Sequence, residues 1–363
     1  MSEKKSQSEE HFSGAAEVQE RYRVDAAVLE AYLAAHVEGF KGPLKIEQFK
    51  GGQSNPTYRL TAGSGVYVMR SKPGPAAKLL ASAHAIEREY RVITALAGAG
   101  FPVPRTFCLC EDEGVIGRAF FIMDCVEGRI LWDQGLPGVS NAQRGAMYDE
   151  MNRVMAALHS VDYQAIGLGD FGRPGNYFAR QISRWSKQYR QSETEKMPAM
   201  DNLIAWLPEN IPEGDETSIV HGDYRMDNMV FHPTEPRVLA VLDWELSTLG
   251  HPLADFSYHC LSWHIPGGLF RGISELDLIS LGIPGESAYV KAYCKRTGRD
   301  RIDNWDFYIA YNMFRLAAIL QGIQKRSLDG TAASERADDA GKRAGPLGEM
   351  GWKFAQKVIA AKG

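Results

Sequence analysis

One octapeptide decides the interpretation of this chain: His221-Gly222-Asp223-Tyr224-Arg225-Met226-Asp227-Asn228. A short apolar run, residues 229–231, follows it, and a second apolar run, residues 238–242, ends at Asp243. Two short apolar runs separated by turn-forming residues predict a hairpin. Asp223, Asn228 and Asp243 are therefore expected on the connections that surround one hairpin.

These three side chains meet the needs of phosphoryl transfer. A carboxylate must orient the attacking hydroxyl and accept its proton, and oxygen ligands must hold magnesium on the phosphates. We predict Asp223 as the catalytic base and Asn228 and Asp243 as magnesium ligands, so that all three are catalytic residues and ATP and Mg²⁺ are the cofactors. The alternative is that these residues only cap turns or begin a helix.

The octapeptide resembles the H-G-D-x-x-x-x-N motif of the aminoglycoside phosphotransferase and choline kinase superfamily. Four further segments are similar to the branch of that superfamily that is associated with acyl-CoA dehydrogenases: residues 49–55, 67–70, 87–90 and 242–245. The resemblance implies an α+β, bilobal, protein-kinase-like fold. It would have a small N-lobe with an antiparallel sheet and a helix, and a larger, mainly helical C-lobe.

The resemblance also implies a nucleotide site in the N-lobe. Residues 51–55 match a phosphate-covering loop, in which glycines let backbone N–H groups approach phosphate oxygens. An ordinary hairpin turn is the alternative for this segment. Residues 123–125 fall where the adenine-binding hinge belongs. The predicted cofactor-binding residues are Gly51, Gly52, Ser54, Asn55, Arg70, Glu89, Met123, Asp124 and Cys125.

Arg70 stands where the kinase pattern usually has a lysine. Arginine is a planar fork that can hold phosphate oxygens bidentately, and Lys72, two residues later, is the runner-up for this role. On the next predicted helix, Glu89 is the better candidate to pair with Arg70 and Glu87 is the runner-up. Solvated charges on a helix face are the alternative for both glutamates.

Three residues near the octapeptide are expected to support it or to depart from the family pattern. His221 should brace the catalytic loop by hydrogen bonding, and Asp255 should clamp it from the following helix. His251 replaces the aspartate of a Gly-Asp-Pro pattern. A metal role for His251 with His259 and His264 is weighed against the more frequent buried or surface histidine.

Hydrophobic patterning divides the chain into two regions that differ in predicted secondary structure. A docking helix is predicted from about residue 24 to before Gly39, strand-like segments with one further helix within residues 81–97 extend to residue 124, and helical spacing dominates afterwards. We predict a flexible tail over residues 1–23, an N-lobe over residues 24–124 and a C-lobe over residues 125–363. Within residues 186–216 only a short helix at 202–207 is predicted, and residues 327–348 are predicted to form a polar loop.

Composition restricts the function classes. Forty-one Lys and Arg against 45 Asp and Glu leave a net charge of −4, which is too balanced for a protein that coats nucleic acid. Five cysteines without a paired Cys-x-x-Cys suit a reducing compartment. The polar N-terminal residues lack a signal peptide pattern, and no segment is apolar enough to span a membrane. We expect a cytoplasmic protein, and a homodimer is the oligomeric state considered.

The acceptor substrate is expected to be a small molecule. Aminoglycosides are polycations and need an acidic pocket, whereas residues 291–326 carry more Lys and Arg than Asp. This excess and the branch resemblance favour an anionic or CoA-linked acceptor such as a hydroxyacyl-CoA. A true aminoglycoside kinase and a catalytically weak, nucleotide-binding regulatory protein are the alternatives. Four aromatic residues could line an acyl pocket or simply pack in the core: Trp244, Tyr258, Trp263 and Phe314.

Overall fold

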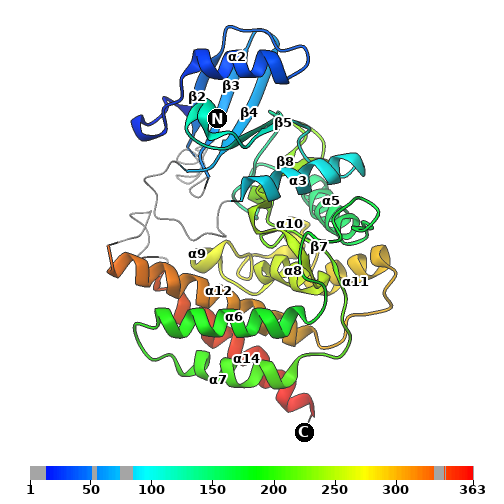
Figure 1. Cartoon of the computed structure of the whole chain (residues 1–363). Helices are drawn as coiled ribbons and strands as arrows, with labels where there is room; N and C mark the ends of the chain where they lie inside the picture. The colour runs from blue at the N-terminus through cyan, green and yellow to red at the C-terminus, as the bar shows by residue number, and fades with distance from the viewer. Residues whose placement is uncertain (1–13, 51–54, 74–84, 331–338, 340, 363) are drawn as a thin grey trace. The chain divides into compact units, whose positions relative to one another are not determined.

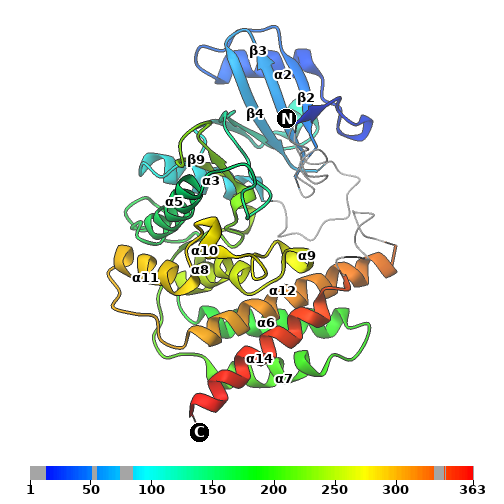
Figure 2. The ribbon, with the colours of Figure 1, turned by 180° about the vertical axis from the view of Figure 1, so that it is seen from behind.

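The structure, a computed structural model, describes residues 14–50, 55–73, 85–330, 339 and 341–362. Its contacts divide the chain into two compact units that are discontinuous in sequence. The first contains residues 1–132, 164–168 and 226–247, and the second contains residues 133–163, 169–225 and 248–363. Figures 1 and 2 show the elements of each unit from opposite sides. The first unit thus includes residues 125–132, 164–168 and 226–247, which all follow residue 124, where the sequence places the lobe boundary.

A six-stranded antiparallel sheet lies at the centre of the first unit, in the order β1-β2-β3-β4-β6-β5. Its strands are β1 (Ala15–Ala16), β2 (Lys45–Phe49), β3 (Thr57–Ala62), β4 (Gly65–Ser71), β5 (Thr106–Cys110) and β6 (Phe120–Asp124). The register places Arg70 of β4 opposite Thr57 on one side and Phe121 on the other. Arg70 therefore lies on an inner strand, where two neighbouring strands hold its backbone.

Helix α2 (Ala26–His36) covers one face of this sheet (Figure 1). Asp25 caps the helix by accepting hydrogen bonds from the backbone N–H groups of Ala27 and Val28, which satisfies two donors that the first turn leaves unpaired. The apolar face of α2 packs into one cluster with the inward side chains of the strands, and α4 (Glu113–Ile116) lies at its edge. The core residues are Leu29, Leu33, Val37, Tyr58, Leu60, Tyr67, Met69, Cys108, Cys110, Phe120 and Ile122.

Helix α3 (Ile86–Gly98) also belongs to the first unit and contacts β5, β6 and η4 (Trp244–Leu246). It buries Val92, Ile93 and Leu96, and on the same helix it buries one carboxylate, Glu89. A second hairpin, β8 (Met229–Phe231) with β9 (Val238–Val241), completes the unit. The backbone N–H of Val241 donates to the carbonyl of Pro102 at 2.8 Å, which attaches this hairpin to the segment after α3.

The described part of the second unit is mainly helical. Helix α12 (Trp305–Leu328) runs through it and contacts α6, α7, α8 and α14 (Figures 1 and 2). A short antiparallel pair, β7 (Ser218–Val220) with β10 (Thr248–Gly250), carries the chain into and out of the octapeptide region. The other helices are α5 (Asn141–His159), α6 (Tyr177–Ser192), α7 (Pro198–Trp206), α8 (Pro252–Cys260), α9 (Gly267–Phe270), α10 (Leu278–Leu281), α11 (Glu286–Thr297) and α14 (Ala344–Lys362).

Residues 14–23 are held against the first unit, whereas the sequence predicts a flexible tail over residues 1–23. Residues 1–13 lie outside the described part, but β1 pairs with β2 and is followed by the turn η1 (Glu20–Tyr22). The Arg118 guanidinium then donates to the carbonyls of Tyr22 and Arg23 at 3.0 and 3.1 Å. Backbone pairing and a distant arginine hold this segment, and neither leaves a hydrophobic pattern in the sequence.

Two further predictions need correction. Helix α6 extends to Ser192, whereas the sequence predicts only the short helix that the structure shows as α7. Helix α14 begins at Ala344, so the predicted polar loop ends earlier than residue 348, and most of its centre lies outside the described residues. No helix among the described residues is long and apolar enough to cross a membrane.

Candidate functional site

Arg70 is the centre of a charged cluster in the first unit. Its Nε lies 2.8 Å from Oε2 of Glu89, and its Nη2 lies 2.7 Å from Oδ1 of Asp243 and 3.2 Å from Oε2 of Glu245. The Arg70 side chain is 9% exposed and that of Glu89 is 2% exposed. Because a buried charge is costly without a partner, Arg70 and Glu89 require each other. The structure thus contains the Arg70–Glu89 pair that the sequence predicts.

The runner-up residues form a separate pair. Lys72 contacts Glu87, and about a third of each side chain is exposed. Lys72 lies two residues after Arg70, and Glu87 lies two residues before Glu89. Both side chains of this second pair are more exposed to solvent than Arg70 and Glu89. This second pair does not compete for the buried position.

Asp243 is held in an unusual backbone conformation. Its φ is +65° and its ψ is +62°, in the left-handed region that residues other than glycine seldom adopt. Strain of this kind persists where the surrounding structure enforces it, and it is concentrated at functional sites. Here β9 ends at Val241 and the turn η4 begins at Trp244, whose indole N–H donates to the carbonyl of Val241 at 2.9 Å. The turn thereby directs Asp243 to Arg70.

Burial and charge act in opposite directions on this cluster. Burial raises the pKa of Glu89 above the usual range of a glutamate, and Asp243 and Glu245 act in the same direction against the lowering effect of Arg70. Burial tends to lower the pKa of Arg70, but the three carboxylates outweigh it and raise that pKa. One guanidinium therefore faces three carboxylates, an arrangement in which an added cation would be favoured electrostatically.

A pocket of about 300 Å³ borders this cluster within the first unit. Arg70, Glu89, Asn228 and Asp243 line its polar side. Residues 123–125, predicted from the sequence as an adenine-binding hinge, also line it. Its apolar walls include Val68, Ile93, Pro104, Ile130, Val230 and Val241. A mostly apolar cavity with a few polar groups at one end is typical of small-molecule and cofactor sites.

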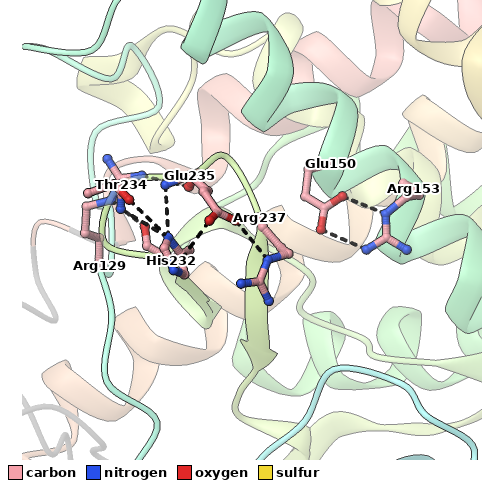
Figure 3. A network of polar contacts seen from close by, with 7 residues as sticks. All are labelled: Arg129, Glu150, Arg153, His232, Thr234, Glu235 and Arg237. Carbon is pink, nitrogen blue, oxygen red and sulfur yellow. Dashed lines mark hydrogen bonds and ion pairs between the residues drawn. The ribbon is translucent and has the colours of Figure 1, made fainter.

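The hairpin that carries Asn228 and Asp243 is attached to the segment after β6. Arg129 exchanges backbone hydrogen bonds of 2.8 Å with Phe231 in both directions. Its guanidinium donates to the carbonyls of His232 at 2.9 Å and Glu235 at 3.0 Å (Figure 3). At the base of the hairpin, the N–H of Leu242 donates to the carbonyl of Asn228 at 2.8 Å. These contacts give the two predicted magnesium ligands a rigid support.

Figure 3 also shows an ion pair within α5 of the second unit. Arg153 donates to Glu150 through Nε at 2.6 Å and through Nη2 at 2.8 Å. The two residues are three apart on the helix, a spacing that brings side chains together on its surface. This pair stabilises α5 locally and involves none of the predicted site residues.

Both oxygens of Asp223 have partners in the second unit. The hydroxyl of Tyr258 donates to Oδ1 at 2.7 Å, and Nη2 of Arg225 lies 2.9 Å from Oδ2. Burial, and then the Asp223 charge, raise the pKa of Tyr258 far above its usual value. The phenol therefore remains a hydrogen-bond donor at any pH the protein meets. The sequence predicts neither contact, and the one with Tyr258 depends on how α8 packs.

The backbone at the start of the octapeptide is held by hydrogen bonds to Asp255. Asp255 of α8 accepts from the N–H of His221 at 2.7 Å and from the N–H of Gly222 at 2.9 Å. Its Oδ2 also lies 3.4 Å from Nε2 of His159. Although burial opposes it, bonding to His159 lowers the pKa of Asp255 below its usual value. The clamp predicted for Asp255 is present, and His221 accepts from the N–H of Asp223 at 3.2 Å.

Arg315 of α12 also holds the octapeptide backbone, by a hydrogen bond that the sequence does not predict. Its Nη2 donates to the carbonyl of Gly222 at 2.8 Å. The guanidinium carbon lies 5.1 Å from the ring centre of Tyr258, close enough for a cation–π interaction. Helices α8 and α12 together therefore set the position of Asp223.

The remaining predicted residues have simpler surroundings. Gly51, Gly52 and Ser54 lie outside the described residues, and Asn55 is buried. His251 caps α8, His259 contacts the Tyr289 hydroxyl at 2.8 Å, and His264 contacts Glu286 at 2.6 Å. The three histidines have different partners, and no group of three or more His, Cys, Asp or Glu suited to a metal is found in the described part of the chain. Trp244, Trp263 and Phe314 are core residues.

The donor types nevertheless fit magnesium. Mg²⁺ prefers oxygen ligands and is usually held by one or two protein groups, with water and substrate phosphates as its other ligands. Asn228 and Asp243 supply an amide oxygen and a carboxylate on the wall of one pocket, beside a cluster with excess negative charge. A larger set of protein ligands is not required.

The sequence of this region matches a family profile. The profile of the phosphotransferase enzyme family, APH, covers residues 45–305. The chain belongs to this family. The octapeptide, the Arg70–Glu89 pair and Asp243 all lie within the matched range, so the resemblance predicted from the sequence is confirmed.

Individual relatives of this phosphotransferase agree. It is 49% identical over 318 residues to acyl-CoA dehydrogenase family member 10 of Mus musculus, covering 87% of this chain and 30% of that protein. A Ralstonia eutropha JMP134 structure, provisionally named an aminoglycoside phosphotransferase, is 64% identical with a TM-score of 0.86 and covers 92% of this chain and 99% of that one. The chain spans less than half the length of the curated relatives it matches.

The fold extends to more distant kinases. A choline kinase from Cryptosporidium parvum Iowa II has a TM-score of 0.64 at 10% identity and covers 93% of this chain and 97% of that one. At this identity the likeness concerns the fold alone. The predicted α+β kinase-like fold is thus confirmed.

Proposed function

We propose that this phosphotransferase transfers the γ-phosphoryl group of ATP to a hydroxyl of a small molecule, with Mg²⁺ as the second cofactor. The observation that carries the proposal is Arg70, which is buried against Glu89 and contacts Asp243 on the wall of a pocket of about 300 Å³. In kinase-like enzymes a cation paired with a helix glutamate orients the nucleotide phosphates.

Each part of ATP has a suitable region in that pocket. The apolar walls and the backbone of residues 123–125 suit a flat base. The guanidinium of Arg70 suits phosphate oxygens, because its planar fork can form two parallel hydrogen bonds. Asn228 and Asp243 would hold Mg²⁺, which would neutralise the charge that develops during transfer.

Asp223 is proposed as the base. The acceptor hydroxyl would give its proton to a carboxylate oxygen of Asp223, its oxygen would form a bond to the γ-phosphorus, and the bond to the β–γ bridging oxygen would break to release ADP. Tyr258 and Arg225 hold the two oxygens of Asp223, and Asp255 and Arg315 hold the backbone before it. The carboxylate is thereby oriented before substrate arrives, which lowers the entropic part of the barrier.

A hydroxyl-bearing acyl-CoA or a related carboxylic metabolite is the proposed acceptor. The similarity to acyl-CoA dehydrogenase family members supports this choice. Phosphorylation would convert the hydroxyl into a better leaving group for a later elimination. We further propose cytoplasmic action on a small molecule, in keeping with five cysteines that lack a paired Cys-x-x-Cys and so suit a reducing compartment.

The test is an ADP-release assay with ATP and Mg²⁺ against hydroxyacyl-CoAs, hydroxy acids, amino alcohols, sugars and aminoglycosides. We expect ADP release that depends on one acceptor class, and a loss of at least about a hundredfold in Asp223→Asn. Asp303→Asn, at an exposed position paired with Arg301, serves as the matched control and should turn over normally. Full activity in Asp223→Asn would refute the assignment of the base.

A nucleotide-binding regulatory protein is the second candidate. One observation favours it: Arg70 is engaged by three carboxylates, so binding phosphate requires rearrangement of these ion pairs. Calorimetric titration with ATP separates the two functions. The enzyme should bind MgATP much more tightly than ATP alone, whereas a regulatory binder need not depend on the metal.

A further inference from the structure

A small cavity lies beside Asp223 in the second unit. It encloses about 20 Å³, and two of its lining residues, Arg225 and Tyr258, are the partners of the Asp223 carboxylate. Arg271 and Gln134 also line it. A volume of this size holds little more than one water molecule. The cavity can therefore accept the terminal oxygens of a ligand, but not a ring.

The charge around this cavity is positive. Two arginines, Arg225 and Arg271, line it, and among the described lining residues there is no Asp or Glu. His259 also lines it, and burial lowers the pKa of that histidine to about 4, so it is neutral at pH 7. The Asp223 carboxylate beside the cavity is bound by Arg225, which balances its charge. An anionic oxygen would be favoured here and an ammonium group disfavoured.

Arg271 is held in place at a conformational cost. Its φ is +47°, in the left-handed region, which is rare for a long side chain. Gln134 donates to the Arg271 carbonyl at 2.6 Å. The next residue, Gly272, lies so close to the Ile265 carbonyl that an added Cβ would be 1.5 Å from its oxygen. The loop therefore needs glycine at 272 and a strained backbone at 271, and it places Arg271 at the cavity.

We propose that the acceptor substrate carries an anionic oxygen group that enters this cavity and binds Arg225 and Arg271. A guanidinium has five N–H donors, so Arg225 can bond both Asp223 and a second anion. The group is a carboxylate of a hydroxy acid or a phosphate of a CoA ester. This inference rests on the proposed function and names the chemical class of its acceptor. It excludes polycationic aminoglycosides, which would bring ammonium groups to two arginines.

The test compares three acceptors that differ in charge: 3-hydroxybutyrate, 3-hydroxybutyramide and 3-hydroxybutyryl-CoA. Binding to the full chain is measured by calorimetry with ATP absent, and turnover is measured by ADP release. Charge-assisted hydrogen bonds are stronger than neutral ones. At least one anionic acceptor should therefore half-saturate the protein at about one-tenth of the concentration that the amide requires. Preference for the acid identifies a carboxylate site, and preference for the CoA ester alone identifies a phosphate site.

Arg271→Asn is the decisive variant, because asparagine tolerates a positive φ better than other residues. It should reduce the preference for the anionic acceptor to less than about threefold. Arg271→Gly, which carries no strain at this φ, should do the same if the asparagine variant folds poorly. The matched control is Arg301→Asn, whose arginine is 79% exposed and bound to Asp303, and it should keep the wild-type preference.

Two outcomes overturn the inference and leave the proposed function standing: equal turnover of acid, ester and amide, or an undiminished preference in Arg271→Asn. If the anionic acceptor binds with the expected preference but no acceptor of any charge releases ADP, the proposed function fails while the anion site stands. Failure of all three acceptors to bind also counts against the anion site.

Discussion

Tyr258 donates a 2.7 Å hydrogen bond to Oδ1 of Asp223, so the proposed base is held by a phenol from α8. Asp255, three residues earlier on the same helix, bonds the backbone just before Asp223. Side chains three apart lie on one face of a helix. One helical face therefore positions both the side chain and the backbone of the base.

Replacing Tyr258 should alter the pH dependence of catalysis. In Tyr258→Phe the ionised carboxylate loses a donor that stabilises it, so the acidic limb of the kcat/KM profile should move to higher pH and kcat should fall about tenfold or more. The profile is measured by ADP release. Tyr308→Phe, in a buried residue of α12, is the control and should leave the profile in place. An unmoved acidic limb in Tyr258→Phe would show that the bond does not act on the base.

Removing Arg70 should destabilise the protein. Arg70→Met leaves Glu89 buried without its cation, and breaking a buried ion pair in this way costs about 3–5 kcal/mol. The added change Glu89→Gln should restore part of that loss, because the uncompensated charge is then absent. Lys72→Met is the matched control. Its pair with Glu87 is about one-third exposed and should contribute less than about 1 kcal/mol. Urea denaturation measures all four proteins.

The backbone of Asp243 predicts a reversal of the usual order of Ala and Gly. At most positions a variant with alanine is more stable than one with glycine. At a φ of +65°, however, alanine is strained and glycine is not. Asp243→Gly should therefore be more stable than Asp243→Ala by about 1 kcal/mol. Both lose the same ion pair with Arg70, so the comparison isolates the backbone. Both should be inactive if Asp243 holds Mg²⁺. Greater stability of the alanine variant would contradict the strained conformation.

His251 should contribute to instability in acid. Burial lowers its pKa from 6.5 to about 4. Below pH 6.5 the unfolded chain therefore takes up a proton that the folded protein accepts only near pH 4, so stability falls as the pH drops through this interval. At most one proton is involved, or about 1.4 kcal/mol per pH unit.

The variant His251→Asn tests this contribution. Asparagine is a good helix cap, so it can replace the acceptor that His251 offers to the N–H of Leu253 at 3.2 Å, but it does not titrate. We expect a smaller loss of stability between pH 6.5 and pH 4 than in the wild type, measured by urea denaturation at several pH values. Parallel curves for the two proteins would contradict the prediction.

Several parts of the site were accessible from sequence because they are local. Asp223 and Asn228 are five residues apart, and Asp243 ends the next apolar run, so chain connectivity alone places these groups around one hairpin. The Arg70–Glu89 pairing also followed from the sequence, because the family resemblance favoured these two residues over Lys72 and Glu87. The residues that hold Asp223 are different. Tyr258 and Arg315 are separated from it by 35 and 92 positions and reach it only through the packing of α8 and α12.

The sequence by itself therefore determined the family, the kinase-like fold and the kind of chemistry, since these depend on motifs and periodicities within short stretches. The tertiary structure decided what surrounds the proposed base: Tyr258 and Arg225 on its oxygens, Arg315 against its backbone, and Arg271 at the adjoining cavity. Such contacts form where buried surfaces meet, and their free energy depends on distances between side chains that no sequence spacing specifies. The acceptor preference inferred here depends on these contacts, whereas the transfer chemistry follows from the octapeptide.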